Sequence, residues 1–342
     1  MSEHNVYPGV TWETRAPQQV GLDPDKLGEM SAYVGGRGCL TRYGYMAYAW
    51  GDAAQRADVA SASKPINAHF LFKAVEEGRI PGLDQRVSAW EPRLNDLNAD
   101  LGYPDRAITW RHMANQVSCY GLVEAPGTAY AYNDWQMALL CDTLYTKVYG
   151  ASWETVDERV LHPGLTDLLG CEDAPTLLAF GLDDRPGRLG ISPRDFCRFG
   201  LLYLHKGNWK GEQLISERYA TMAVSDPLPA SLPRAGLEAA EMIAGQRSHG
   251  SRRLPDNQTE HWGSYSWLLW INGLDVEGQR MWPDAPPDTY GAFGHGGPRA
   301  MVVIPSLDLV ISYNDAQALN KWVNGPDNPT NTALKLLVEA AT

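Results

Sequence analysis

Two side chains of the segment Ser61-Ala62-Ser63-Lys64 have the types and the spacing needed for nucleophilic chemistry. The chain contains this Ser-x-x-Lys pattern once. On a helix, residues three positions apart share a face, so the Ser61 hydroxyl and the Lys64 amine would point into the same space. An alcohol is a weak nucleophile at neutral pH and needs a base beside it. The segment therefore predicts a nucleophile next to its base, although the same spacing also arises by chance in chains of this length.

The residues after this motif indicate the helix that would position it. Apolar residues recur at helical spacing from Ile66 to Val75, and Gly78 is suited to end the helix. Pro65 falls in the first turn, where its missing N–H costs little. The N-terminus of a helix supplies positive potential, which lowers the pKa of an amine, as burial also does. We therefore expect a helix that begins at the motif and favours Lys64 as a base.

Two later segments carry further groups of this kind. Residues 126–134 read Pro-Gly-Thr-Ala-Tyr-Ala-Tyr-Asn-Asp, and residues 293–297 read Phe-Gly-His-Gly-Gly. Together with Ser-x-x-Lys, and in this order, they resemble the serine β-lactamase and penicillin-recognising hydrolase superfamily, closest to its esterase, D-aminopeptidase and class C-like branch. That branch has Ser-x-x-Lys, then Pro-Gly-Thr-x-x-x-Tyr-x-Asn, then a Lys-Thr-Gly or His-Gly-Gly strand.

The resemblance extends over most of the chain, because similar text stands at four further places. These are residues 20–23, 76–80, 108–112 and 191–195. The resemblance implies an α/β (α+β) fold of the β-lactamase/transpeptidase type, in which an antiparallel sheet is flanked by helices and contains an inserted helical domain. Hydrophobic patterns agree with such a fold. They predict strands at 40–50, 265–271, 300–304 and 307–313, and helices at 135–145, 194–205 and 332–341.

Strands from both ends of the chain must then meet in one sheet. We assign residues 1–85 and 260–342 to the α/β domain and residues 86–259 to the helical domain. The helical domain includes a long polar loop at 225–262, which either covers the cleft or is disordered. Clefts form at such domain interfaces, and the motif residues would gather there.

The resemblance also implies roles for individual residues. Ser61 would be the acylated nucleophile, Lys64 the amine that helps to take its proton, and Tyr132 the second general base. Tyr130 is the competitor for that role. Tyr132 is preferred because four residues after Thr128 is the spacing of the family, while core packing is the simpler interpretation of Tyr130.

The third motif places His295 where many relatives have a lysine on a strand that lines the cleft. A neutral imidazole can donate to a substrate carbonyl or orient Tyr132, but it provides no fixed charge for a carboxylate. We therefore expect weaker recognition of penicillin-type carboxylates, with a purely structural histidine as the alternative. Gly296 and Gly297 would border the oxyanion site. Trp282, in a rigid loop upstream, would form part of the substrate wall.

Two residues depart from the family pattern. Asp134 replaces the usual asparagine, and its carboxylate could hold Lys64 charged, which opposes a role for Lys64 as a base. Pro298 follows the Gly-Gly pair, where relatives use a backbone N–H to hold the oxyanion, and proline has none. Either a shifted register lets Gly297 or Arg299 donate, or hydrolysis is slow or absent.

Composition restricts the possible partners. A formal net charge of -12 argues against nucleic acid, and no apolar run is long enough to cross a bilayer. Five cysteines without paired spacing and an N-terminus without an apolar core predict free thiols and a cytoplasmic location. No metal or nucleotide motif is found, so no cofactor is implied. The sequence does not predict an oligomeric state.

The sequence thus favours a serine hydrolase that works through an acyl-enzyme on a small ester, namely a carboxylesterase. An amidase, D-aminopeptidase or β-lactamase-like hydrolase is the alternative within the enzymes. A catalytically quiet ligand-binding protein on the same scaffold is the alternative from another class, and Asp134 and Pro298 favour it.

Overall fold

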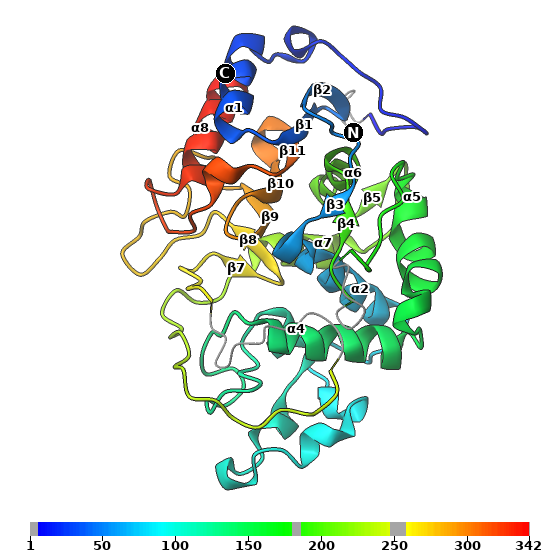
Figure 1. Ribbon diagram of the computed structural model, residues 1–342, viewed down its shortest axis with the longest axis vertical. Coiled ribbons are helices and arrows are strands. Elements are labelled where there is room, and N and C mark those ends of the chain that lie inside the picture. Colours follow the sequence, from blue (N-terminus) through cyan, green and yellow to red (C-terminus); the bar gives the residue numbers. More distant parts are fainter. Residues whose placement is uncertain (1–5, 180–185, 247–257, 342) are drawn as a thin grey trace.

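The computed structural model describes residues 6–179, 186–246 and 258–341, and its centre is one antiparallel sheet of seven strands (Figure 1). The strand order is β2-β1-β11-β10-β9-β8-β7, so strands from both ends of the chain meet as predicted. The strands are β1 Arg37–Arg42, β2 Tyr45–Trp50, β7 Tyr265–Ser266, β8 Leu269–Ile271, β9 Tyr290–Gly294, β10 Arg299–Ile304 and β11 Leu309–Asn314. The fold is therefore mixed α and β, of the expected type.

Helices cover the sheet and fill the middle of the chain. In Figure 1, α1 and α8 lie side by side on one side of the sheet, and α6 packs against β1, β10 and β11. The α-helices are α1 Pro24–Val34, α2 Lys64–Glu76, α3 Trp110–Ala114, α4 Asp134–Cys141, α5 Asp167–Leu169, α6 Pro193–Leu204, α7 Glu217–Ser225 and α8 Pro329–Ala341. Two π-helices, Asp142–Val148 and Asp157–Thr166, continue α4 and precede α5. The residue boundaries between the two predicted domains stay a prediction.

Short strands and 3-10 turns complete the described chain. The two-residue strands pair as β3 Ala57–Asp58 with β4 Gly190–Ile191 and as β5 Asn208–Trp209 with β6 Glu212–Gln213. The first pair matters for the site, because β3 leads directly into the 3-10 turn Ala60–Ser63 and then into α2. Among the described residues, no helix is both long enough and apolar enough to cross a membrane.

Two predicted strands are hairpins instead. Residues 40–50 fold into β1 and β2, which turn at Tyr43 and Gly44, both with positive φ. Residues 265–271 fold into β7 and β8, which turn at Trp267 and Leu268 with φ of 47° and 68°. Bulky residues rarely adopt this conformation, so the residue types at 267 and 268 do not predict a turn. Tertiary contacts fix the turn, since the Trp267 backbone N–H donates to Asn115 Oδ1 at 2.9 Å.

The described parts of the polar loop 225–262 lie along the segment that carries the second motif. Tyr130 donates its backbone N–H to the carbonyl of Pro233 and accepts from the N–H of Ala235. Farther along, the Gln258 N–H donates to the carbonyl of Tyr132 at 2.9 Å. The rest of the loop, residues 247–257, lies outside the described residues. Both described parts of the loop therefore form backbone hydrogen bonds with the second motif.

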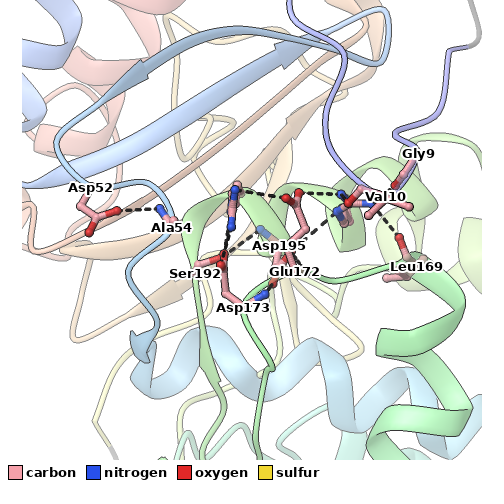
Figure 2. A network of polar contacts seen from close by, with 11 residues as sticks. Gly9, Val10, Asp52, Ala54, Leu169, Glu172, Asp173, Ser192 and Asp195 are labelled. Carbon is pink, nitrogen blue, oxygen red and sulfur yellow. Dashed lines mark hydrogen bonds and ion pairs between the residues drawn. The ribbon is translucent and has the colours of Figure 1, made fainter.

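A buried ionic network joins the N-terminus of α6 to two other segments (Figure 2). The Asp195 carboxylate accepts the backbone N–H groups of Glu172 and Asp173, both at 2.8 Å. The Arg198 guanidinium donates to Glu172 Oε1 at 2.8 Å and to the carbonyls of Gly9 and Leu169. Burial raises the pKa of Asp195 despite these donors. The network holds α6, which supports the sheet, in a fixed position.

Replacement of Arg198 by methionine should destabilise the fold. Both the Arg198 and Asp195 side chains are 0% exposed, and loss of one partner leaves buried acceptors and a carboxylate without compensation. We expect a loss of about 3–5 kcal/mol in the free energy of unfolding, measured by urea denaturation. Lys335→Met, on the exposed face of α8, is the control and should change stability by less than about 0.5 kcal/mol. Equal stability of Arg198→Met and Lys335→Met would show that the buried Arg198 network does not stabilise the fold.

Candidate active site

Ser61 and Lys64 are in direct contact at the start of the buried helix α2. Lys64 Nζ donates to Ser61 Oγ at 2.9 Å, and the Lys64 side chain is only 4% exposed. Ser61 lies in the 3-10 turn Ala60–Ser63 rather than in the α-helix, which begins at Lys64. The turn and the helix together still bring the hydroxyl and the amine onto one face. The geometry is that of a nucleophile beside a group that can exchange its proton.

The turn that presents Ser61 has an unusual backbone. Ala60 has a φ of 51°, a left-handed conformation that residues with a side chain seldom adopt. Opposite it, a Cβ on Gly294 would meet the carbonyl oxygen of Val59 at 2.2 Å. Glycine at the end of β9 is therefore required for the sheet to approach the nucleophile turn so closely.

Tyr132 is the tyrosine that reaches this pair. The Lys64 ammonium lies 4.5 Å from the centroid of the Tyr132 ring, and Tyr132 and Ser61 line the same cavity. Tyr130 points elsewhere: its side chain is fully buried, packs against His261 and Tyr265, and does not line the cavity. The structure thus brings together Ser61, Lys64 and Tyr132 and leaves Tyr130 in the core.

Asp134 lies at the first position of α4 and faces Lys64 from the helical side. Its Oδ1 is 3.7 Å from Lys64 Nζ. Burial lowers the pKa of Lys64, but the neighbouring Tyr132 and the Asp134 carboxylate together raise it by more, so the net pKa of Lys64 is raised. Asn133, the residue between Tyr132 and Asp134, caps α4 by accepting the Gln136 N–H. In this resting arrangement Lys64 is a cation, in contrast to the expectation that the helix start and burial would favour it as a base.

His295 lies in the turn between β9 and β10, not on a strand as the sequence suggested. The turn spans residues 295–298, and His295 has a φ of 52°. Its imidazole is exposed and lines the cavity that contains Ser61. Partial burial first, and then the nearby Arg299 and Arg188, lower the pKa of His295 against the opposing effect of Asp58 and Asp134. The ring is therefore neutral at pH 7 and can donate or accept a hydrogen bond.

The same turn limits which backbone groups can hold an oxyanion. Gly297 already donates its N–H to the carbonyl of Gly294 at 3.1 Å, which removes one of the two substitutes expected for Pro298. Arg299, the other substitute, begins β10 and pairs with Gly294. Gly296 lines the cavity beside Ser61. The Gly297 N–H is therefore already used within the turn, while Gly296 borders the cavity.

The cavity at Ser61 has a volume of about 210 Å³ and an aromatic wall. Trp270 and Trp322 meet at a ring distance of 5.0 Å, and Phe293 lies 5.0 Å from Trp322. Gln258 and Thr259 complete the lining on the polar side. Trp282 does not line the cavity: it is fully buried and packs behind Phe293, with ring centroids 5.2 Å apart.

Sequence reasoning missed most of this wall. Phe293 could have been found, since it belongs to the same motif as His295 and lies two residues before it. Trp270 falls within the single strand predicted at 265–271, and Trp322 lies in irregular chain after β11 that carries no motif. No sequence pattern predicts that Trp322 reaches the cavity.

Metal binding finds no support in the residues that the structure describes. Within them, no group of three or more His, Cys, Asp or Glu side chains is arranged to hold a metal ion.

The fold and this site define a hydrolase of the serine β-lactamase type. A family model described as Beta-lactamase matches residues 30–340, and the chain belongs to that family. No curated protein matches the sequence.

Solved structures show the same fold at low identity. A Bacteroides dorei protein, provisionally classed as a β-lactamase, is 14% identical with a TM-score of 0.63, and the match covers 94% of this chain and 99% of that one. A Bacillus anthracis protein, provisionally classed as a 6-aminohexanoate-dimer hydrolase, is 14% identical with a TM-score of 0.63 and coverage of 98% and 87%. The simvastatin synthase of Aspergillus terreus, in a mutant form, is 12% identical with a TM-score of 0.60 and coverage of 92% and 98%.

Replacement of Asp134 by asparagine should change the pH dependence of Ser61. The variant removes a negative charge that stabilises the Lys64 ammonium, so the coupled Lys64 and Tyr132 pair should lose its proton at lower pH. We expect the rate of Ser61 labelling by a fluorophosphonate to reach its half-maximum at a lower pH than in the wild type. Asp134→Glu, which keeps the charge, is the control. An unchanged midpoint in Asp134→Asn would show that this carboxylate does not influence the pair.

Proposed function

We propose that the protein is a carboxylesterase that hydrolyses small, uncharged esters through an acyl-Ser61 intermediate. The observation that carries this proposal is the 2.9 Å contact between Lys64 Nζ and Ser61 Oγ at the wall of a cavity that Tyr132 also lines. A nucleophile, a proton-exchanging amine and a second acid–base group thus meet where a substrate can enter. This arrangement suits acyl transfer.

The reaction would proceed in two halves. The Ser61 oxygen attacks the ester carbonyl carbon, and its proton passes to the Lys64 and Tyr132 pair. The tetrahedral oxyanion is held by the N–H groups of Ser61 and Gly296, and collapse expels the alcohol after it receives the proton. Water then attacks the acyl-Ser61, gives a proton to the same pair, and releases the carboxylic acid. Because Lys64 rests as a cation, the pair can accept the Ser61 proton only after it has released one proton of its own, from the Lys64 ammonium or from the Tyr132 hydroxyl.

The lining of the cavity supports an uncharged acyl group. Trp270, Phe293 and Trp322 present aromatic surface, and the histidine at the entrance has a lowered pKa. A substrate carboxylate would find no permanent positive charge among these lining residues. An aromatic or branched apolar acyl group would bury its surface there without loss of a polar contact.

Two alternatives remain open to test. Amide hydrolysis uses the same groups, and one structural neighbour is provisionally named for it. A catalytically quiet binding protein is favoured by the absent N–H of Pro298 and by the charged state of Lys64.

Covalent labelling tests the nucleophile directly. A fluorophosphonate should add one label to the wild type, at Ser61, because only this hydroxyl accepts a hydrogen bond from the buried Lys64 amine. Intact mass and peptide mapping measure this. Ser61→Ala should not be labelled, whereas Ser63→Ala, which removes the neighbouring hydroxyl of the same turn, should be. Labelling that persists in Ser61→Ala would remove the mechanism, and an unlabelled wild type would support the binding protein.

Comparison of substrates tests the ester assignment. Short-chain p-nitrophenyl esters should have a higher kcat/KM than nitrocefin, because the cavity offers His295 in place of a fixed positive charge for the β-lactam carboxylate. The variant His295→Lys should narrow the difference by improving nitrocefin turnover. Equal kcat/KM of the wild type on both substrates would show that His295 does not weaken recognition of the β-lactam carboxylate.

A further inference from the structure

Asp58 connects three segments that meet at the nucleophile. Its Oδ1 accepts the backbone N–H of Ala60 at 2.8 Å and Arg188 Nε at 3.0 Å. Its Oδ2 accepts Arg299 Nη1 at 2.9 Å and a second nitrogen of Arg188. Ala60 precedes Ser61, Arg299 begins β10 directly after the His295 turn, and Arg188 approaches β4. One carboxylate therefore joins the nucleophile turn, the hairpin and the chain that follows residue 185.

The contact with Ala60 stabilises a backbone conformation that needs support. Ala60 is left-handed, one position before Ser61, and a backbone of this kind persists only where its surroundings fix it. The close approach of Gly294 to Val59 places the hairpin against the same turn. Asp58 is thus positioned to fix both the direction of Ser61 Oγ and its distance from the residues of the hairpin.

The charges of this cluster also reach the reacting groups. Arg188, Arg299 and Asp58 carry one net positive charge together. The side chains of the three are between 17% and 23% exposed, so solvent screens them only partly. Arg188 affects Lys64 in the direction opposite to Tyr132 and Asp134, and both arginines affect His295 in the direction opposite to Asp58 and Asp134. Asp58 therefore moderates the positive potential at the site.

We propose that Asp58 is a positioning residue of the active site, which fixes the Ser61 turn against the hairpin and sets the charge that Lys64 and His295 experience. This inference rests on the proposed function for its effect on turnover. Its effect on His295 does not depend on catalysis. No motif of the sequence points to Asp58, because its partners come from residues far apart in the chain.

The variant Asp58→Asn separates the two parts of this role. The amide oxygen can still accept the Ala60 N–H, but the two guanidinium groups lose their counter-charge and their two-pronged contact. We expect kcat for ester hydrolysis to fall by roughly 10- to 100-fold, with KM changed much less. The acidic limb of the kcat/KM profile should move to lower pH, because the added positive potential disfavours the protonated Lys64. Arg188→Gln should move it to higher pH.

A second measurement needs no activity. The His295 ring can be titrated by NMR, with its signals assigned through a His295→Gln variant. Its pKa should be lower in Asp58→Asn than in the wild type and higher in Arg188→Gln, while circular dichroism verifies folding. A purely structural role would not produce opposite shifts. If the wild type hydrolyses esters and folded Asp58→Asn equals it in kcat and in both titrations, the inference is wrong. If the wild type is inactive but the His295 shifts appear, only the proposed function fails.

Discussion

The buried Lys64 amine is the constraint on which the rest of the site depends. A cation this deeply enclosed requires compensation, and it receives a hydroxyl from Ser61, the face of an aromatic ring from Tyr132 and a carboxylate from Asp134. These groups come from two different parts of the chain. The sheet and the helices must therefore pack against each other accurately around Lys64, because a displacement of either would leave the amine without partners.

Three structural features fix the packing of the sheet and the helices around Lys64. The helix α2 is buried along most of its length, so Lys64 has a rigid base. The loop after α7 supports the opposite side through Pro233, Ala235 and Gln258, which bond to the backbone around Tyr132. On the third side, Gly294 allows the sheet to approach the nucleophile turn. The same elements that complete the core thus also fix the acid–base groups.

The departures from the family pattern form a consistent local design. A neutral histidine and an aromatic wall replace fixed positive charge in the cavity, while two arginines are bound to Asp58 beside it. The short turn at residues 295–298 uses the Gly297 N–H for its own hydrogen bond, and Gly296 lines the same cavity as Ser61. The proposal of an uncharged substrate rests on these features of the cavity.

The sequence by itself determined the fold class, through the resemblance of its ordered motifs to a known superfamily, and the pairing of Ser61 with Lys64, through their spacing at the start of a helix. It also favoured Tyr132 by its spacing from Thr128. Only the tertiary structure decided that residues 40–50 and 265–271 are hairpins, that Trp322 lines the cavity in place of Trp282, and that Asp58 joins three segments. Such contacts join residues distant in the chain, and neither side of them carries a local pattern, so they are set by packing and by the pairing of buried charges.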